Sequence, residues 1–146
     1  MDTKTGKQKT DSPEQTRGAQ CSKALTPSDE RTISAIIGCA IDVHREVGPG
    51  FLEAVYHRAM CIALAASGLR FATEHHVAVT YRGHRIGVQR LDLVVEEIIA
   101  VELKSVERLN FIHKAQLLSY LRAAKLEAGL LFNFNATPLL IRRVVL

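Results

Sequence analysis

The sequence predicts an α/β protein in which a central mixed sheet of about five strands is flanked by helices. Apolar residues recur at helical spacing in two segments near the N-terminus and again in one later segment. Short β-branched runs, bounded by turn-forming or charged residues, fill the sequence between and after them. The order is therefore helix, helix, three strands, helix, two strands. Hairpins in the middle and one helical crossover before the last strands are typical of a sandwich around a mixed sheet.

The first helix has clear boundary signals. Thr26 is a capping hydroxyl, and a proline and two acidic residues follow it, as expected for a helix N-terminus. Gly48 to Gly50 ends the helix, and His44 on its apolar stripe is expected to be a packed, hydrogen-bonded core histidine. A second helix should run from about 52 to 67 before Gly68. Its expected apolar face consists of Leu52, Val55, Ala59, Ile62 and Ala63.

The remaining elements follow from alternation between strand and helix patterns. Strands are predicted at 71–81, 85–95, 98–104, 128–133 and 139–145. A helix is predicted over 109–123, between the third and fourth strands. Its expected buried stripe consists of Ile112, Ala115, Leu118, Leu121 and Ala124.

Composition sets limits on the class of protein. The 146 residues fit a disordered polar tail over 1–25 and one domain over 26–146. No run has the length of a membrane span and no signal-peptide segment is visible, so we expect a cytoplasmic protein. The net charge of +4 favours an anionic partner only mildly. Three cysteines without metal-ligand spacing suit free thiols in a reducing compartment. They are Cys21, Cys39 and Cys61.

Charged residues at the end of the third strand are the strongest functional signal. Glu102 and Lys104 follow an apolar, β-branched run and share one face of the strand. Burying them is costly unless another group offsets the charge, and a divalent cation with its water would do so. Taken alone, the pair is better interpreted as a same-face ion pair. Asp92 on the preceding strand changes the balance towards a metal-type site.

The turn between these strands decides whether the two carboxylates meet. A two-residue turn at 96–97 would pair Asp92 with Val101 and place its side chain on the wrong face. One further residue in the turn, or one bulge, would pair Asp92 with Glu102. The sequence therefore predicts a three-residue turn or a bulge.

Several separated motifs resemble one family. The sequence GFLEAVY at 50–56 matches a G-x-x-E-x-x-Y signature, and RLDL at 90–93 and VELK at 101–104 match the next blocks. HKAQLLSYL at 113–121 and GLLFNF at 129–134 match the rest. Over about 28–145 the chain resembles the GxxExxY proteins, a branch of the PD-(D/E)XK nuclease superfamily with a restriction-endonuclease-like fold.

The resemblance implies a role for each residue of the site. Asp92 and Glu102 would bind Mg²⁺ or Mn²⁺, with the backbone carbonyl of Leu103 as a third oxygen ligand. Lys104 would orient or help to deprotonate the attacking water. Glu53 would complete the site from the second helix through a metal-bound water. An acid in the first turn of a helix is also favoured by the helix dipole, so a purely structural role for Glu53 stays open.

Two further residues correspond to a Gln-x-x-x-Tyr motif in the helix after the catalytic strand. Gln116 and Tyr120 lie one turn apart on one face, and the resemblance implies contact with substrate. The alternative is a glutamine at the edge of the core and a half-buried tyrosine. One departure from the superfamily pattern is Leu91, which stands where proline often precedes the aspartate. The proline is often absent in related sequences, and we do not interpret this as loss of activity.

These observations predict a metal-dependent nuclease that hydrolyses phosphodiester bonds of DNA. The alternative is a catalytically silent nucleic-acid-binding or regulatory module with a nuclease-like fold. The implied partner is nucleic acid, DNA in the first place, with a homodimer or a larger complex left open. The choice between DNA and RNA, and between endonuclease and exonuclease action, is also open at this stage.

Overall fold

The structure is a computed structural model that describes residues 23–146. Most of the predicted tail, including Cys21, lies outside the described residues. The elements are α1 (Pro27–Val47), α2 (Glu53–Ala66), β1 (Phe71–Tyr81), β2 (His84–Val95), β3 (Ile99–Lys104), α3 (Phe111–Ala124), β4 (Ala128–Asn133) and β5 (Leu140–Val145).

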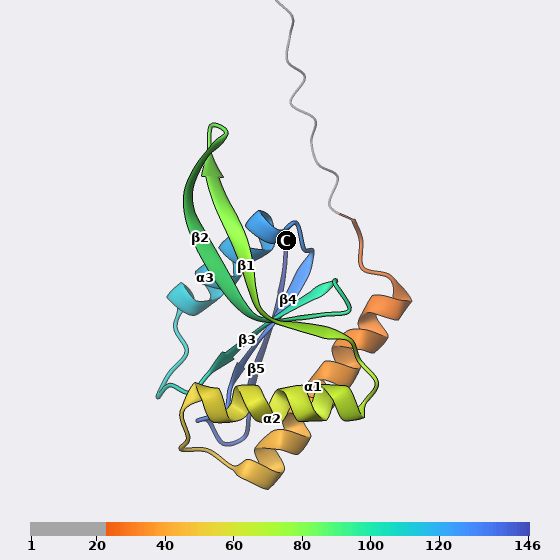
Figure 1. Cartoon of the computed structure of the whole chain (residues 1–146). Helices are drawn as coiled ribbons and strands as arrows, with labels where there is room; N and C mark the ends of the chain where they lie inside the picture. The colour runs from red at the N-terminus through yellow and green to blue at the C-terminus, as the bar shows by residue number, and fades with distance from the viewer. Residues whose placement is uncertain (1–22) are drawn as a thin grey trace, which may run out of the picture.

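The five strands form one mixed sheet in the order β1-β2-β3-β4-β5. Only β3 and β4 are parallel, and α3 connects them as the crossover. Helices α1 and α2 pack on one face of the sheet and α3 packs on the other, each over its own hydrophobic cluster (Figure 1). The predicted α/β sandwich is therefore confirmed. Within residues 23–146, no helix combines the length and apolarity needed to cross a bilayer.

Helix α1 begins and packs as its sequence predicts. The Thr26 side chain accepts a hydrogen bond from the backbone N–H of Asp29, whose carboxylate accepts one from Thr26 N at 2.8 Å. This reciprocal pair satisfies two of the N–H groups that a helix start leaves free. Ile36 is fully buried on the opposite side of the helix from solvent. His44 is half-buried and its Nε2–H donates to the carbonyl of Ala136 at 2.8 Å, so the expected core role is confirmed.

The buried face of α2 differs from the prediction. Tyr56, Met60 and Leu64 are fully buried. Of the predicted face, Ala59 and Ala63 contact the core only in part, whereas Leu52, Val55 and Ile62 are 81%, 40% and 73% exposed. The helix is apolar on most of its circumference, so periodicity alone does not define one face. Contacts from distant segments decide the orientation, and the largest is the stacking of Tyr56 on Phe134, with ring centroids 4.5 Å apart.

The turn between β2 and β3 confirms the prediction of a third turn residue. Val95 pairs with Ile99, so residues 96–98 form the turn. Glu96 and Glu97 both have positive φ, 52° and 58°. The same register, continued towards the other end of the two strands, places Asp92 opposite Glu102.

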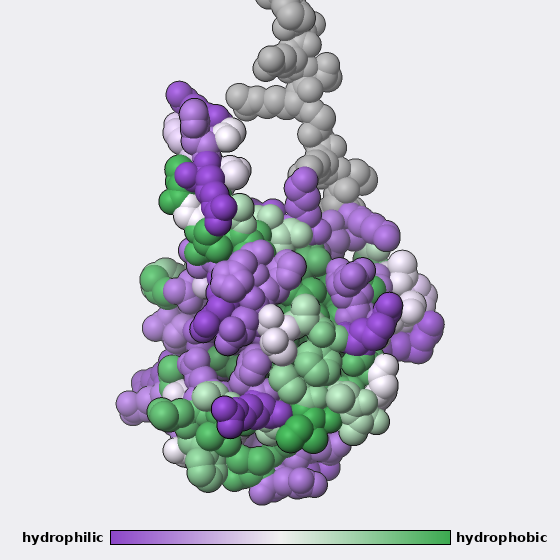
Figure 2. Space-filling model, viewed as in Figure 1, coloured by the Kyte–Doolittle hydropathy of each residue, from purple (hydrophilic) through white to green (hydrophobic). Residues whose placement is uncertain are grey.

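The β1–β2 hairpin extends well beyond the rest of the sheet (Figure 1). It closes in the two-residue turn Arg82-Gly83, where both residues have positive φ (48° and 77°), as a type I′ turn requires. All residues of 84–90 are exposed, so this part of β2 meets solvent on both faces. We refer to residues 78–90 as the arm. Figure 2 shows the hairpin projecting from the body, with a mostly hydrophilic surface.

Helix α3 lies close to the sheet because β4 contains a glycine. A Cβ on Gly129 would meet Cδ1 of Leu117 at 3.0 Å and the backbone oxygen of Ala100 at 3.2 Å. Leu117 and Leu121 are the fully buried residues of α3. The predicted stripe was wrong in the first half of the helix. Ile112 is 49% exposed and Ala115 is also exposed, because the helix is rotated to place Leu117, which the stripe did not include, over the glycine.

Candidate active site

The predicted acidic pair meets where the β2–β3 ladder ends. The last paired residues on this side are Leu93 and Val101. Beyond them, carboxylates replace backbone carbonyls as hydrogen-bond acceptors. Asp92 Oδ2 accepts from the backbone N–H of Leu103 at 2.8 Å, and Glu102 Oε1 accepts from the backbone N–H of Asp92 at 3.2 Å. The side chains of Asp92 and Glu102, the two candidate metal ligands, therefore hold β2 and β3 together at this point.

Burial makes this pair electrostatically unfavourable without a cation. Glu102 is only 7% exposed. Loss of hydration raises the pKa of its carboxyl group to about 8, and the negative charge of Asp92 adds to this effect. Lys104 opposes the shift by favouring the ionised form. With a pKa of about 8, Glu102 holds a proton at neutral pH when no cation is present. A divalent cation would take the place of that proton and balance the charge of both carboxylates.

Lys104 is held at the end of β3 by the neighbouring strand. Its backbone carbonyl accepts from Phe134 N at 2.9 Å, and its partner in the parallel ladder is Asn133. Asn133 is 1% exposed, and its amide forms two hydrogen bonds with the backbone of Val106. These bonds fix the chain as it leaves the site. The sequence analysis did not assign Asn133 this role, although it lies in the last matching motif.

A cavity of about 410 Å³ lies beside the acidic pair and contains the helical acid. Asp92, Leu103 and Glu53 line it together, so the prediction that the second helix contributes an acid to this region is consistent with the geometry. Four charged or ionisable residues of the lining had no assigned role in the sequence analysis. They are His57, Arg58, Glu74 and Arg90.

His57 is the most informative of these. Its Nε2–H donates to the backbone carbonyl of Asp92 at 3.1 Å, which connects α2 directly to the acidic pair. Its spacing from Glu53, four residues along the helix, was a usable signal because residues at i and i+4 share one face. The backbone conformation of Asp92 is thus held from both sides, by Glu102 and by His57.

Tyr56 organises the loop that precedes Glu53. Its hydroxyl donates to the carbonyl of Gly48 at 2.7 Å and accepts from Phe51 N at 3.2 Å. Gly50 between them has a φ of 103°, which side chains with a Cβ rarely adopt. The three residues of the G-x-x-E-x-x-Y pattern therefore belong to one local structure. Gly50 allows the turn, Glu53 follows the turn, and the hydroxyl of Tyr56 holds the turn in place.

Gln116 and Tyr120 lie near the acidic pair but outside that cavity. They line a separate depression of about 310 Å³ on α3 together with Gln89. Burial raises the pKa of Tyr120, and the charges of Glu102 and Asp92 raise it further. Tyr120 packs against the cluster that contains Ala100, and Ala100 shares its face of β3 with Glu102, so the tyrosine lies on the same side of the sheet as Glu102.

The candidate ligands converge only in part. Among residues 23–146, no three His, Cys, Asp or Glu side chains are close enough to form a metal-binding group. Asp92 and Glu102 are in contact, whereas Glu53 is an exposed residue across the cavity. A magnesium ion keeps several waters in protein sites, so two carboxylates and one backbone oxygen are a sufficient protein contribution.

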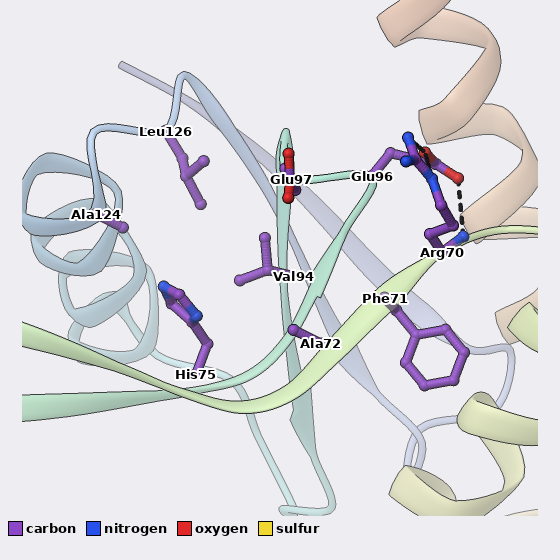
Figure 3. Close-up of a pocket in the computed structure, with 9 residues that line it drawn as sticks. All are labelled: Arg70, Phe71, Ala72, His75, Val94, Glu96, Glu97, Ala124 and Leu126. Carbon is purple, nitrogen blue, oxygen red and sulfur yellow. Dashed lines mark hydrogen bonds and ion pairs between the residues drawn. The ribbon is translucent and has the colours of Figure 1, made fainter.

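The structure also contains a larger cavity, of about 440 Å³, at the C-terminal end of β2. It lies around the 96–98 turn and next to the end of α3, and none of the predicted site residues lines it (Figure 3). At one edge, Arg70 and Glu96 form hydrogen bonds of 2.8 to 3.0 Å. Its lining is mainly apolar, and of its two acids, Glu96 and Glu97, the first is neutralised by Arg70, so we place the chemistry in the smaller cavity.

Comparison with known proteins agrees with this geometry. A family model described as the PD-(D/E)XK nuclease superfamily matches residues 30–144. The chain belongs to this superfamily. The match covers every helix and strand except the first three residues of α1 and the last residue of β5. A PD-(D/E)XK nuclease fold is therefore assigned to the chain, with its mixed sheet and flanking helices.

Other comparisons are weaker. A solved structure described as "Crystal structure of SSO0001" is 21% identical and aligns with a TM-score of 0.49. The alignment covers 81% of this chain and 54% of that one, so the chain spans about half the length of that protein. Among curated proteins no match was found.

Proposed function

We propose that this PD-(D/E)XK superfamily member hydrolyses phosphodiester bonds of DNA with bound Mg²⁺ or Mn²⁺. The observation that supports this most directly is the contact between Asp92 and Glu102, in which the buried Glu102 has a pKa of about 8. The buried Glu102 and the partly buried Asp92 repel each other when both are ionised, and acids whose pKa is shifted in this way are typical of functional sites.

Asp92, Glu102 and the carbonyl of Leu103 would hold the cation, and Glu53 would reach it through a water. When bound, such a cation polarises the scissile phosphate, lowers the pKa of a coordinated water and offsets charge on the leaving oxygen. Carboxylate and carbonyl oxygens are the ligands that Mg²⁺ and Mn²⁺ prefer.

The other residues would bind and orient. Lys104, next to the pair, would hold the attacking water and take part in its deprotonation. Arg58 and Arg90 line the cavity and would contact phosphate oxygens of the substrate. Gln116 and Tyr120, in the neighbouring depression, would contact the nucleotide next to the scissile bond.

We also infer that the chain is of the GxxExxY type within the superfamily. Support comes from the local structure in which Gly50 turns the chain, Glu53 faces the cavity and Tyr56 fixes the loop. The proposal includes a cytoplasmic location, which suits the free thiols of Cys39 and Cys61.

A cleavage assay tests the proposed activity. Purified protein is incubated with single-stranded and duplex DNA, and with RNA, in Mg²⁺, Mn²⁺ or EDTA. We expect cleavage that requires the metal and that falls at least about a hundredfold in Lys104→Ala, as is typical for loss of a group acting in general acid–base chemistry. A similar loss is expected in Asp92→Asn, which removes a proposed metal ligand. Glu46→Gln removes an exposed carboxylate on α1 and is the matched control. Equal cleavage by wild type and Lys104→Ala, or no cleavage in any condition, would contradict the proposal.

The second candidate is a nucleic-acid-binding module without turnover. It is favoured by the finding that no third acidic or histidine side chain joins Asp92 and Glu102 within residues 23–146. Calorimetry distinguishes the two. Metal binding that disappears in Asp92→Asn supports the enzyme, whereas DNA binding that depends on neither the metal nor Asp92 supports the module.

A further inference from the structure

The arm takes no part in the acidic pair, yet its sequence is unusual for an exposed hairpin. Residues 84–90 are all exposed, and a ribbon that meets solvent on both faces is only marginally stable without a partner. The arm is the outer part of a strand pair that begins at Phe71 and Val95 and ends at Tyr81 and His84. A partner of defined chemistry would explain why this length of sheet is retained.

The charge of the arm has a single sign. From His75 to Leu91 the sequence has no Asp or Glu, whereas it has Arg82, Arg85 and Arg90 and three histidines. The nearest acid, Glu74, is 3.7 Å from Arg90, and both side chains are more than half exposed. Such an exposed pair contributes little and is screened by salt, so it leaves Arg90 available to another anion.

The strand register shows that one face of the arm continues from the cavity. His76 pairs with Arg90, Ala78 with Val88, and Thr80 with Arg85, beyond a bulge. Directly paired residues share a face of the sheet, and every second residue of β1 does so too. Arg90 also lines the cavity that contains Asp92. A track of small and basic side chains therefore leads from the candidate active site to the end of the hairpin.

We propose that the arm binds the backbone of duplex DNA beyond the scissile phosphate, an inference that rests on the proposed nuclease function. At about 3.3 Å per residue, the five residue steps from Arg85 to Arg90 span roughly 16 Å, which corresponds to about five base-pair steps of 3.4 Å. A two-stranded ribbon also has the width that the major groove of B-DNA admits. Arg90 contacts a phosphate next to the site, and Arg85 and Arg82 contact the duplex farther along.

The arm also has exposed apolar residues, but their arrangement does not indicate a protein partner. Arg82 lies over the ring of Tyr81, with its guanidinium carbon 5.1 Å from the centroid, so this ring is partly covered within the arm. Ile86 and Val88 are 65% and 43% exposed and lie between Arg85 and Arg90 along β2. Protein interfaces concentrate apolar residues and exclude charge at their centre, whereas DNA interfaces are strongly positive. The arm has the second pattern.

The test measures DNA binding without catalysis. Fluorescence anisotropy of a labelled 20-base-pair duplex is recorded in EDTA from 50 to 300 mM salt for wild type and for the double variant Arg82→Gln/Arg85→Gln. Two lost phosphate contacts should reduce the salt slope by about 2 and weaken binding roughly 60-fold at 0.1 M salt, since each contact contributes about 0.9 to the slope relative to 1 M. Arg82→Lys/Arg85→Lys should restore most of the affinity because the charges return.

The control is Arg31→Gln/Arg45→Gln, which removes the same charge from exposed positions of α1. It should leave affinity within about twofold of wild type, because screened charges far from the duplex contribute little. Equal losses in both double variants, or no loss in the arm variant, overturn the proposal. If the arm variant changes the sedimentation of the protein but not its affinity for DNA, the proposal is also overturned, and the arm is then a contact between copies of the chain.

The outcomes separate this inference from the proposed hydrolysis. If the wild type cleaves DNA with Mg²⁺ and the arm variant binds DNA equally well, the proposed nuclease function stands and the proposed role of the arm is wrong. If the arm binds duplex DNA but the protein cleaves nothing, the role of the arm stands and the proposed hydrolysis is wrong. Absence of any DNA binding in EDTA contradicts the role of the arm in either case.

Discussion

Replacing Glu102 by Gln should make the protein more stable at neutral pH. In the folded protein, burial and the charge of Asp92 raise the pKa of Glu102 from 4.5 to about 8. The unfolded chain ionises near 4.5, so between these values the folded state binds more protons. Stability conferred by the protonated carboxyl group is complete below pH 4.5 and is lost progressively as the pH rises towards 8. Glutamine keeps the shape and cannot ionise, which removes this loss.

The magnitude follows from the interval in pH. From 4.5 to 7 is 2.5 units, and each unit corresponds to about 1.36 kcal/mol, so the variant should gain about 3 kcal/mol at pH 7. The gain should approach zero at pH 4 and level off above pH 8. It is a large fraction of the roughly 5–15 kcal/mol by which folded proteins exceed the unfolded state.

Urea denaturation in EDTA, followed by circular dichroism at pH 4, 5.5, 7 and 8.5, measures the difference between Glu102→Gln and wild type. Glu46→Gln reports the effect of removing a surface carboxylate on α1, and its difference should change little with pH. The reasoning is refuted if Glu102→Gln is less stable than wild type at pH 7, or if the difference between the two proteins does not grow with pH.

Three further outcomes are expected. Millimolar Mg²⁺ should raise the melting temperature of wild type but not of Asp92→Asn in differential scanning fluorimetry, because a ligand stabilises only the protein that binds it; equal shifts would point to non-specific ion effects. Tyr56→Phe should lose about 1–2 kcal/mol in urea denaturation, since it removes two part-buried hydrogen bonds; an unchanged midpoint would show that the hydroxyl is dispensable. Gly129→Ala should lose about 1–3 kcal/mol because the new methyl group meets Leu117 at 3.0 Å; a stabilised variant would mean that α3 moves away without cost.

The acidic pair was predictable because its geometry depends on local rules. The side-chain period of a strand and the length of one turn suffice to place Asp92 opposite Glu102. The type and order of every element followed from patterns within single segments, and so did the caps of α1. Such information is contained in neighbouring residues, which is why sequence analysis recovers it.

The orientation of the helices was not predictable in the same way. Helix α2 turns Tyr56 inward because Phe134, 78 positions away, provides the surface on which it stacks (134 − 56 = 78). Helix α3 turns Leu117 inward because Gly129 on β4 leaves room. Both helices are apolar on several sides, so only contacts between distant segments select the buried face. The contribution of His57 depended on the same packing, and the sequence analysis therefore assigned it no contact.

The exposed length of the β1–β2 hairpin was also missed. Its alternation of apolar and polar residues is that of an ordinary half-buried strand, and nothing in 84–90 signals that no layer covers it. Whether a strand is covered depends on the length of the helix on that face. Helix α3 contacts the hairpin near Val77, which is buried, and does not reach the turn.

The use of carboxylates in place of peptide carbonyls at the end of the β2–β3 ladder has a practical consequence. The amide protons of Leu103 and Asp92 are retained only while the two acids point towards the backbone. If a bound cation draws the carboxylate of Asp92 or Glu102 away from the backbone, the amide proton that this carboxylate accepted becomes free to exchange with solvent. These two peptide groups at the end of the ladder would then act as a built-in reporter of the site, readable by deuterium uptake or by nitrogen-15 chemical shifts, that requires no substrate.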